Sequence, residues 1–443
     1  MWKRVATLAA IILAAAPVYA AAPTAIDSFR LANGLEVIVI PNHRIPAVSQ
    51  MIWYRVGGGD DPLGKSGLAH FHEHTMFLGT KLHKGGEYAA IAASHGGDEN
   101  AFTGHDATAY FINVPKNELP MVMELEADRM HELTPTDEAM VREKQVIIEE
   151  RRMRIENDPE ALLSEQVDAN LFRNHPYHWP VIGWMHEMEG LTKDDVLAFH
   201  KLWYHPNNAI LIISGDITAK EVKPLAEKYY SNLPKVTLPE RHWNEEPPQN
   251  TERRIVMHHI NVKQPVWSRS YAASSVAYGQ TEQAVPLFVL AEILGDGKTS
   301  RLYQSLVVEQ KLASGVDVEY DGFTLGPATF EISVTPENGV ALDVLEKAVD
   351  KELARTLSQP FSDAELIRAK TLLKAETIYA RDGLTSMARI MGTIRICGLP
   401  TDYFTKWPTM IDAVTSQQVA DAAKESLQMN QSVTAQLLPE EEK

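Results

Sequence analysis

Three residues in one short run have the types and the spacing of a metal-dependent hydrolytic site. His70, Glu73 and His74 occupy positions i, i+3 and i+4 of the segment 67–79, and such positions share one face of an α-helix. Two neutral imidazoles can ligate zinc, and a neighbouring glutamate that is not a ligand can take a proton from a zinc-activated water. The spacing His-x-x-Glu-His therefore predicts a zinc-dependent hydrolase. The competing interpretation is a polar helix face with coincidental histidines.

A third ligand has to come from elsewhere, because a catalytic zinc keeps three protein ligands and one open position. A second helix is predicted to start at Thr134, whose hydroxyl can cap it, and to continue to residue 151. Glu143 and Glu150 lie two turns apart on one face of that helix, whereas Glu149 points about 100° away. We therefore predict Glu150 as the third ligand and Glu143 as an acceptor that orients a ligand histidine. For either glutamate, the alternative is a solvated surface charge.

The elements that must position these residues follow a mixed pattern. Amphipathic helices alternate with short apolar strands at 35–40, 209–214 and 328–334. This alternation predicts an α+β fold. A polar, proline-rich stretch at 234–250 reads as a linker between an N-terminal domain, 21–233, and a C-terminal domain, 251–443.

The two domains look like degenerate copies of one unit. Glu150 has a counterpart in Glu376, within a helix of similar pattern, and a repeat of this length indicates a duplicated domain. The copies differ where chemistry is expected. All 16 histidines lie at or before His259, and Ala369 stands where Glu143 would be. The C-terminal domain therefore cannot hold the same kind of zinc site, and we expect it to shape a cavity and bind substrate.

The first 20 residues have the pattern of a secretory signal peptide. Lys3 and Arg4 precede a short apolar run, and a small-residue cleavage site ends at Ala20. The apolar run is too short to span a bilayer comfortably. We therefore expect an exported, periplasmic protein with no stable membrane insertion after cleavage; an uncleaved anchor is the alternative.

Net charge and cysteine content indicate which binding partners and which disulfides this chain can have. The 443-residue chain has a formal net charge of −17, which becomes −19 once Lys3 and Arg4 are removed. An acidic protein does not suit nucleic acid, and long-range steering would favour cationic peptides. Cys397 is the single cysteine, so no intrachain disulfide can form, and we expect it to be a small core residue.

The zinc motif, the downstream Glu150 and several further segments together resemble the pitrilysin/insulysin and mitochondrial-processing-peptidase family of zinc endopeptidases. The similar segments are 33–39, 96–103, 108–110, 175–183 and 204–216. The resemblance implies two homologous lobes, each a largely antiparallel sheet with helices packed on it, which enclose a cavity. It also implies one zinc ion per chain and peptide substrates.

The same resemblance assigns a substrate-binding strand. Asn100 and Ala101 match family positions that hold the substrate main chain beside the site, where the peptide adds as a strand to a sheet edge. The alternative for Asn100 is a turn residue. Other histidines are expected to have structural roles, namely His72, His95, His105, His175 and His178.

One pair of positions departs from the family pattern. Active single-chain members carry an Arg and a Tyr, seven residues apart in the C-terminal half, which bind substrate and stabilise the developing oxyanion. Here Val307 and Ser314 occupy those positions, and loss of oxyanion donors can cost several kcal/mol. We therefore expect a homologous partner subunit that supplies the pair. The alternatives are a non-hydrolytic periplasmic peptide-binding or assembly subunit and a zinc hydrolase with a non-peptide substrate.

Overall fold

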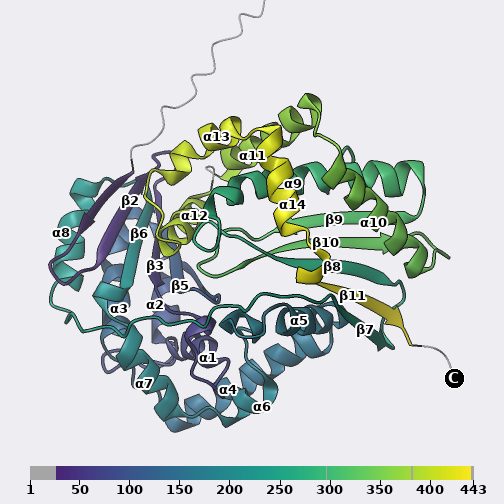
Figure 1. Ribbon diagram of the computed structural model, residues 1–443. Coiled ribbons are helices and arrows are strands. Elements are labelled where there is room, and N and C mark those ends of the chain that lie inside the picture. The colour runs from purple at the N-terminus through teal and green to yellow at the C-terminus, as the bar shows by residue number, and fades with distance from the viewer. Residues whose placement is uncertain (1–25, 296, 381–382, 441–443) are drawn as a thin grey trace, which may run out of the picture.

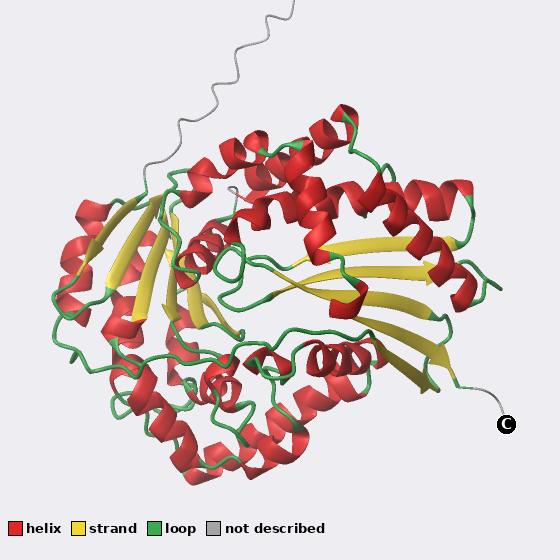
Figure 2. Cartoon of the chain, in the orientation of Figure 1, coloured by secondary structure: helices red, strands yellow, loops and turns green. Residues whose placement is uncertain are grey.

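The protein folds into two lobes, each with one β-sheet covered by helices (Figures 1 and 2). This computed structural model describes residues 26–295, 297–380 and 383–440. The predicted signal peptide, 1–20, lies outside these residues. Within the described ranges, no helix combines the length and the apolar character needed to cross a membrane.

The N-terminal lobe is built on a six-stranded sheet in the order β1-β2-β6-β3-β5-β4. Its strands are β1 (Asp27–Arg30), β2 (Glu36–Pro41), β3 (Ala47–Tyr54), β4 (Asp98–Thr103), β5 (Thr108–Pro115) and β6 (Ala209–Gly215). Strands β2 and β6 run parallel, and the other neighbouring pairs are antiparallel. Among the described residues β4 pairs with β5 alone, so its other side is a free sheet edge.

Eight helices of the N-terminal part are described. They are α1 (Leu68–Thr75), α2 (Glu87–Ser94), α3 (Leu119–His131), α4 (Asp137–Arg151), α5 (Pro159–Leu171), α6 (Met185–Gly190), α7 (Lys193–Trp203) and α8 (Ala219–Tyr230). Alternate strand residues face opposite sides of the sheet. Val37 and Val39 of β2 therefore pack against the core under α1, α3, α4 and α7, whereas Ile38 and Ile40 pack on the other face.

The C-terminal lobe is built on a five-stranded sheet in the order β7-β11-β8-β10-β9. Its strands are β7 (Arg253–His259), β8 (Val266–Ala273), β9 (Ala313–Tyr320), β10 (Ala328–Pro336) and β11 (Ser432–Pro439). Its helices are α9 (Ala284–Leu294), α10 (Leu342–Ser358), α11 (Asp363–Ala380), α12 (Leu384–Ile396), α13 (Tyr403–Ala413) and α14 (Ser416–Ser426).

Shorter helical turns join these elements in both lobes. The 3₁₀ turns are η1 (Gly58–Asp60), η2 (Lys116–Glu118), η4 (Pro176–His178), η5 (Pro206–Asn208), η6 (Thr281–Gln283) and η8 (Met429–Gln431). Two π-helical turns are η3 (Arg152–Glu156) and η7 (Tyr303–Glu309). The proposed linker, 234–250, contains no helix or strand.

The two sheets share one topology. The order β2-β6-β3-β5-β4 in one lobe corresponds to β7-β11-β8-β10-β9 in the other, and in each lobe the first of these pairs is the parallel one. Helices α10 and α11 also follow β9 and β10 along the chain, as α3 and α4 follow β4 and β5. The predicted α+β fold with two homologous, largely antiparallel lobes is therefore confirmed.

One helix from each half of the chain packs on the β-sheet of the other lobe. Helix α5 packs its Leu163 and Val167 against β11 of the C-terminal sheet. Its counterpart α12 packs Met391 and Ile394 against the face of the N-terminal sheet that carries Ile38. Figure 1 shows α12 beside β3 and β6, and α5 beside β11 and β7. This exchange joins the lobes through buried apolar surface.

A glycine and an ion-pair cluster fix α12 on the N-terminal sheet. A Cβ atom on Gly392 would lie 1.9 Å from Cε2 of Trp53, so only glycine permits this close approach. Farther along α12, Nε of Arg395 donates to Glu36 at 2.7 Å, and Nη2 of Arg55 donates to the same carboxylate at 3.2 Å. Burial alone would raise the pKa of Glu36, but its arginine partners lower it overall.

Two local predictions had different outcomes. The start predicted for the second helix was wrong: Thr136, rather than Thr134, caps α4, accepting a hydrogen bond of 3.1 Å from the backbone N of Ala139. The backbone N of Thr134 instead donates to Gly79, which holds Thr134 outside the helix. Cys397 is buried, as predicted for a small core residue.

Candidate metal centre

The helix that carries His70, Glu73 and His74 is preceded by a glycine in a left-handed conformation. Gly67 has φ +88° and a Cβ atom there would lie 2.6 Å from the carbonyl oxygen of Ile182, so glycine is required. The buried carboxylate of Asp61 accepts hydrogen bonds of 2.8 Å from the backbone N atoms of Gly67 and Ala69. These bonds satisfy free N–H groups at the first turn of α1 and fix its orientation.

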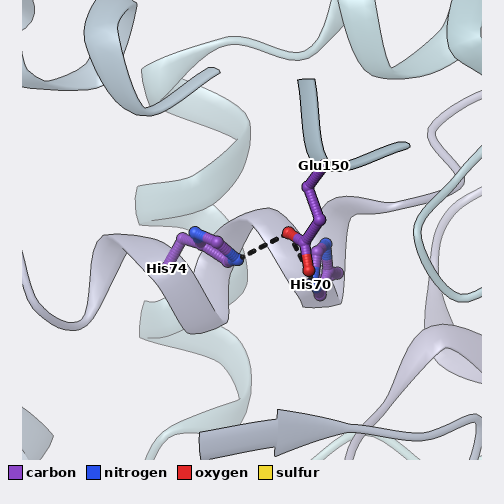
Figure 3. Close-up of side chains that lie close together, drawn as sticks. All are labelled: His70, His74 and Glu150. Carbon is purple, nitrogen blue, oxygen red and sulfur yellow. Dashed lines mark ion pairs between the residues drawn. The ribbon is translucent and has the colours of Figure 1, made fainter. Parts of the chain in front are cut away.

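Two helices bring three potential ligands together. His70 and His74 project from α1, and Glu150 from the C-terminal end of α4, toward one point (Figure 3). Oε2 of Glu150 lies 3.7 Å from Nε2 of His70 and 3.3 Å from Nε2 of His74. One ligand atom from each residue lies within 4.8 Å of the others. In the part of the chain that the structure describes, no other such group of histidine, cysteine and acidic residues is found.

The fourth predicted member, Glu143, contacts the far side of one imidazole. Its Oε1 lies 2.8 Å from Nδ1 of His74, about two turns before Glu150 along α4. This bond fixes the ring and leaves Nε2 directed at the ligand cluster. Burial lowers the pKa of His74, but the hydrogen bond to Glu143 and the nearby carboxylate of Glu150 outweigh it and raise the pKa to about 9. Burial and the neighbouring His74 lower the pKa of His70 to about 4.

The residues fit a zinc ion. Oε2 of Glu150 and Nδ1 of His70 are buried and have no hydrogen-bond partner, and an unpaired buried oxygen between two imidazole nitrogens is costly unless a cation lies there. The other oxygen, Oε1 of Glu150, forms an ion pair with Nη1 of Arg154 at 3.0 Å. Two imidazole nitrogens and one carboxylate oxygen form a donor set typical of catalytic zinc.

Glu73 stands beside the ligands without belonging to their cluster. Its side chain is buried, and its Oε2 accepts a hydrogen bond of 2.5 Å from Oγ1 of Thr103, at the end of β4. Burial raises the pKa of Glu73, and the bond from Thr103 opposes that rise. A carboxylate held in this way is suited to exchange a proton with a group bound next to the ligands.

The predicted substrate-binding residues lie on the same strand as Thr103. Asn100 is exposed and Ala101 is half-buried, both on the edge strand β4. Oδ1 of Asn100 accepts a hydrogen bond of 2.8 Å from the backbone N of Ala101. Because side chains alternate along a strand, Ala101 shares the face of Thr103 and Glu73, whereas Asn100 and Phe102 point to the opposite face.

The five histidines that were expected to have structural roles each have a local partner. Nε2 of the buried His72 lies 3.0 Å from Nδ1 of His200, and His95 lies 2.8 Å from a carboxylate oxygen of Glu118. His105 and His178 contact backbone carbonyl oxygens, and His175 accepts from the backbone N of Tyr177. None of the five belongs to the ligand cluster.

Two residues of the centre were missed in the sequence. Thr103 closes the run 96–103 and was given no part, because a threonine at a strand end carries no spacing signal. Arg154 was detectable in principle: it follows Glu150 by four residues, the spacing of a helical ion pair. That pair lies where α4 gives way to the π-helical turn η3.

The positions of the missing Arg/Tyr pair lie in the other lobe. Val307, in η7, is half-buried and packs on the C-terminal core. Ser314, at the start of β9, donates a hydrogen bond of 3.3 Å to the carbonyl oxygen of Pro336. Figure 1 shows β9 and α1 in different lobes, so neither side chain belongs to the ligand cluster.

Two family models match most of this chain. Residues 36–183 match the family model described as insulinase (peptidase family M16), and residues 190–373 match the peptidase M16 inactive domain. Zinc protease PqqE of Helicobacter pylori is 31% identical over 82% of this chain and 81% of its own length. The chain belongs to peptidase family M16. An uncharacterized zinc protease of Rickettsia bellii is 25% identical to this M16 chain over 82% of it and 85% of the relative.

Solved structures share the fold of this M16 chain. A protease from Helicobacter pylori superposes with a TM-score of 0.87 and 28% identity, covering 94% of this chain and 100% of the other. The periplasmic protease PqqL of Escherichia coli superposes with a TM-score of 0.79 and 22% identity, covering 93% of this chain but 47% of PqqL. The two-lobed unit of this M16 chain thus corresponds to about half of that longer protein.

Proposed function

We propose that this chain is a zinc-dependent endopeptidase that hydrolyses peptides or small unfolded polypeptides. The observation that carries the proposal is the convergence of His70, His74 and Glu150 on one point, with the non-ligand Glu73 beside them. The homologues named zinc proteases support zinc as the metal and peptides as the substrate. When bound there, zinc would polarise the scissile carbonyl and lower the pKa of a water molecule.

The chain's own residues supply the remaining steps. The free edge of β4 would hold the peptide main chain as an added strand. Asn100 and Ala101 lie on that strand, three and two residues from Thr103, which holds Glu73. Glu73 would take a proton from the attacking water and pass it to the leaving amine. Glu143 keeps His74 in the orientation that binding requires.

The direct test compares the wild-type chain with Glu73→Gln. We expect both proteins to contain zinc by metal analysis and, when each is assayed together with a homologue that carries the Arg/Tyr pair, only the wild type to cleave a quenched peptide library. Glu149→Gln is the matched control, because Glu149 is exposed and lies next to Glu150 in sequence but pairs with Arg152 at the surface. Equal cleavage by the wild type and Glu73→Gln would refute the assigned base.

We further propose that this chain is the zinc-bearing subunit of a heterodimer. Val307 and Ser314 cannot supply a cation and a phenol, and PqqL carries the corresponding unit as only part of a longer chain. A homologous partner with an intact Arg/Tyr pair would provide them. The isolated chain should then be nearly inactive and should gain activity when co-purified with such a homologue that lacks His-x-x-Glu-His. Full activity of the isolated chain would refute the partner.

The same two positions favour a second candidate function. Without the Arg/Tyr pair, the chain could serve as a non-hydrolytic peptide-binding or assembly subunit. The retained Glu73 argues for hydrolysis, since peptide binding alone needs no proton carrier. Peptide binding without cleavage, both alone and with the homologue, would favour this alternative.

We also propose export to the periplasm, which rests on the signal-peptide pattern of residues 1–20. Cell fractionation of a Gram-negative host expressing the full chain should place it in the periplasm. Amino-terminal sequencing of that material should begin at Ala21. Recovery of the uncleaved chain in the cytoplasm would contradict export.

A further inference from the structure

An arginine from the C-terminal part of the chain lies on the proposed substrate-binding strand. Arg389 projects from α12, the helix that packs on the N-terminal sheet. Its guanidinium carbon lies 4.0 Å from the ring centroid of Phe102 on β4 and 6.0 Å from that of Phe111 on β5. The first of these distances is typical of a cation–π contact. The exchange of α12 between lobes therefore places a positive charge beside the free edge of β4.

Among the described residues no carboxylate forms an ion pair with the guanidinium of Arg389, although Glu376 lines the same cavity. Arg389 is exposed, and its guanidinium makes no ion pair or hydrogen bond with any residue that the structure describes. Arg395, less than two turns later on the same helix, is by contrast fully engaged with Glu36 and Leu399. An arginine carries five N–H donors in a planar fork. The guanidinium of Arg389 is held only by its stacking on Phe102, so its N–H donors are available to a ligand.

An apolar cavity opens next to Arg389. It has a volume of about 360 Å³, within the range of small-ligand pockets. Aromatic and aliphatic side chains form most of its wall, chiefly Phe288, Phe323, Ile390, Tyr403 and Trp407. Phe323 and Thr393 also line a neighbouring cavity that extends to Phe102. The two cavities thus share part of their wall, so the apolar cavity lies next to the one that extends to Phe102.

The geometry of strand addition connects this cavity with the metal centre. A peptide paired with the edge of β4 would alternate its side chains between the two faces of the sheet. One face holds Thr103 and Glu73. The other face holds Phe102 and Arg389, with the apolar cavity beside them. A residue of the peptide that points away from Glu73 would therefore meet Arg389.

We propose that Arg389 is a substrate-positioning residue and that the cavity beside it is a specificity pocket for a large apolar side chain of the peptide. The guanidinium donates hydrogen bonds to main-chain carbonyl oxygens of the added strand, while the aromatic wall takes the side chain. The substrate class is then peptides with a bulky aliphatic or aromatic residue near the scissile bond. This inference rests on the proposed peptidase function.

Binding can be measured apart from cleavage in the Glu73→Gln background. The probes are fluorescent decapeptides that carry one Phe, Leu or Ala at a varied position, and the readout is Kd by anisotropy. We expect Phe and Leu peptides to bind more tightly than the Ala peptide at one position. Arg389→Ala should weaken their binding roughly tenfold, as for loss of hydrogen bonds to a charged group. Arg389→Gln, which keeps a side chain over Phe102, should weaken binding similarly, and Arg389→Lys should lie in between.

Matched controls separate this inference from the proposed function. Lys347→Ala removes an exposed charge from α10 in the same lobe, where Lys347 pairs with Asp343, and should leave Kd unchanged. In the otherwise wild-type chain, assayed with its homologue, Arg389→Ala should raise KM and leave kcat within about twofold. Cleavage with equal KM in wild type and Arg389→Ala would overturn the role of Arg389 alone. Equal binding of the Phe, Leu and Ala peptides would overturn the proposed pocket. Absence of cleavage by the wild type, both alone and with its homologue, would refute the peptidase function.

Discussion

Oγ1 of Thr103 donates a hydrogen bond of 2.5 Å to Oε2 of Glu73. This bond joins the last residue of the edge strand β4 to the carboxylate that stands beside the ligand cluster. The strand that would bind the peptide therefore also fixes the group that would move the proton. A peptide seated on β4 and the side chain of Glu73 would share one rigid support.

We predict that Thr103→Val lowers kcat roughly tenfold, the usual scale for loss of a partner that orients a site residue. Valine has nearly the shape of threonine but no hydroxyl, so Glu73 would lose its fixed orientation. Thr103→Ser restores the hydroxyl and should restore most of kcat. KM and zinc content should be unchanged in both variants. A similar kcat in the valine and serine variants would show that Thr103 acts only through strand packing.

The bond between Glu143 and His74 should control metal affinity. We predict that Glu143→Ala weakens zinc binding by about 10-fold to 100-fold, because Nδ1 of His74 loses the acceptor that fixes its ring. Competition with a chromogenic chelator measures this effect. Glu149→Ala changes an exposed glutamate on the same helix and should leave the affinity unaltered. Equal affinities of the two variants would exclude the role assigned to Glu143.

Gly392 should be essential for docking of α12. A Cβ atom at this position would overlap Trp53, so Gly392→Ala must displace the helix or the indole ring. We predict a loss of about 1–3 kcal/mol in the free energy of unfolding, the usual range for overpacking. Gly190→Ala is the control, since nothing lies within 4 Å of a Cβ atom there. Chemical denaturation of both variants provides the measurement, and equal stabilities would contradict the close contact.

The Glu36 cluster should make stability depend on pH. Its arginine partners lower the pKa of Glu36 from the ordinary 4.5, so the folded state binds the proton less readily than the unfolded state. The stabilisation is therefore complete above about pH 4.5 and is lost as pH falls through the lowered folded-state pKa. Glu36→Gln should lower the free energy of unfolding by about 2 kcal/mol at pH 7, because the half-buried guanidinium groups of Arg55 and Arg395 lose their charged hydrogen-bond acceptor.

The informative quantity is the difference in stability between the wild type and Glu36→Gln. It should shrink as the pH is lowered below 4.5, because the wild-type carboxyl then becomes protonated too. Denaturation curves collected between pH 3 and pH 7 would measure it. A difference that stays constant over that range would show that the charge of Glu36 does not stabilise the packing of α12 on the N-terminal sheet.

The sequence alone determined the local chemistry of this protein. His70, Glu73 and His74 lie within one helical turn of each other, and Glu143 and Glu150 lie on one face of one helix. Helical periodicity therefore fixes their relative directions before any tertiary contact forms. Alternating apolar strands and the similarity of the two halves likewise indicated the α+β class and the duplication, since both are local or repeated patterns.

Only the tertiary structure decided which segments meet. Thr103 is close to Glu73 because β4 packs against α1. Arg389 contacts Phe102 because α12, from the C-terminal half of the chain, packs on the N-terminal sheet. Contacts between segments so far apart in the chain depend on the shapes of buried surfaces, such as the fit of Gly392 against Trp53. Such complementarity has no periodic signal in the sequence, because it depends on two distant surfaces at once.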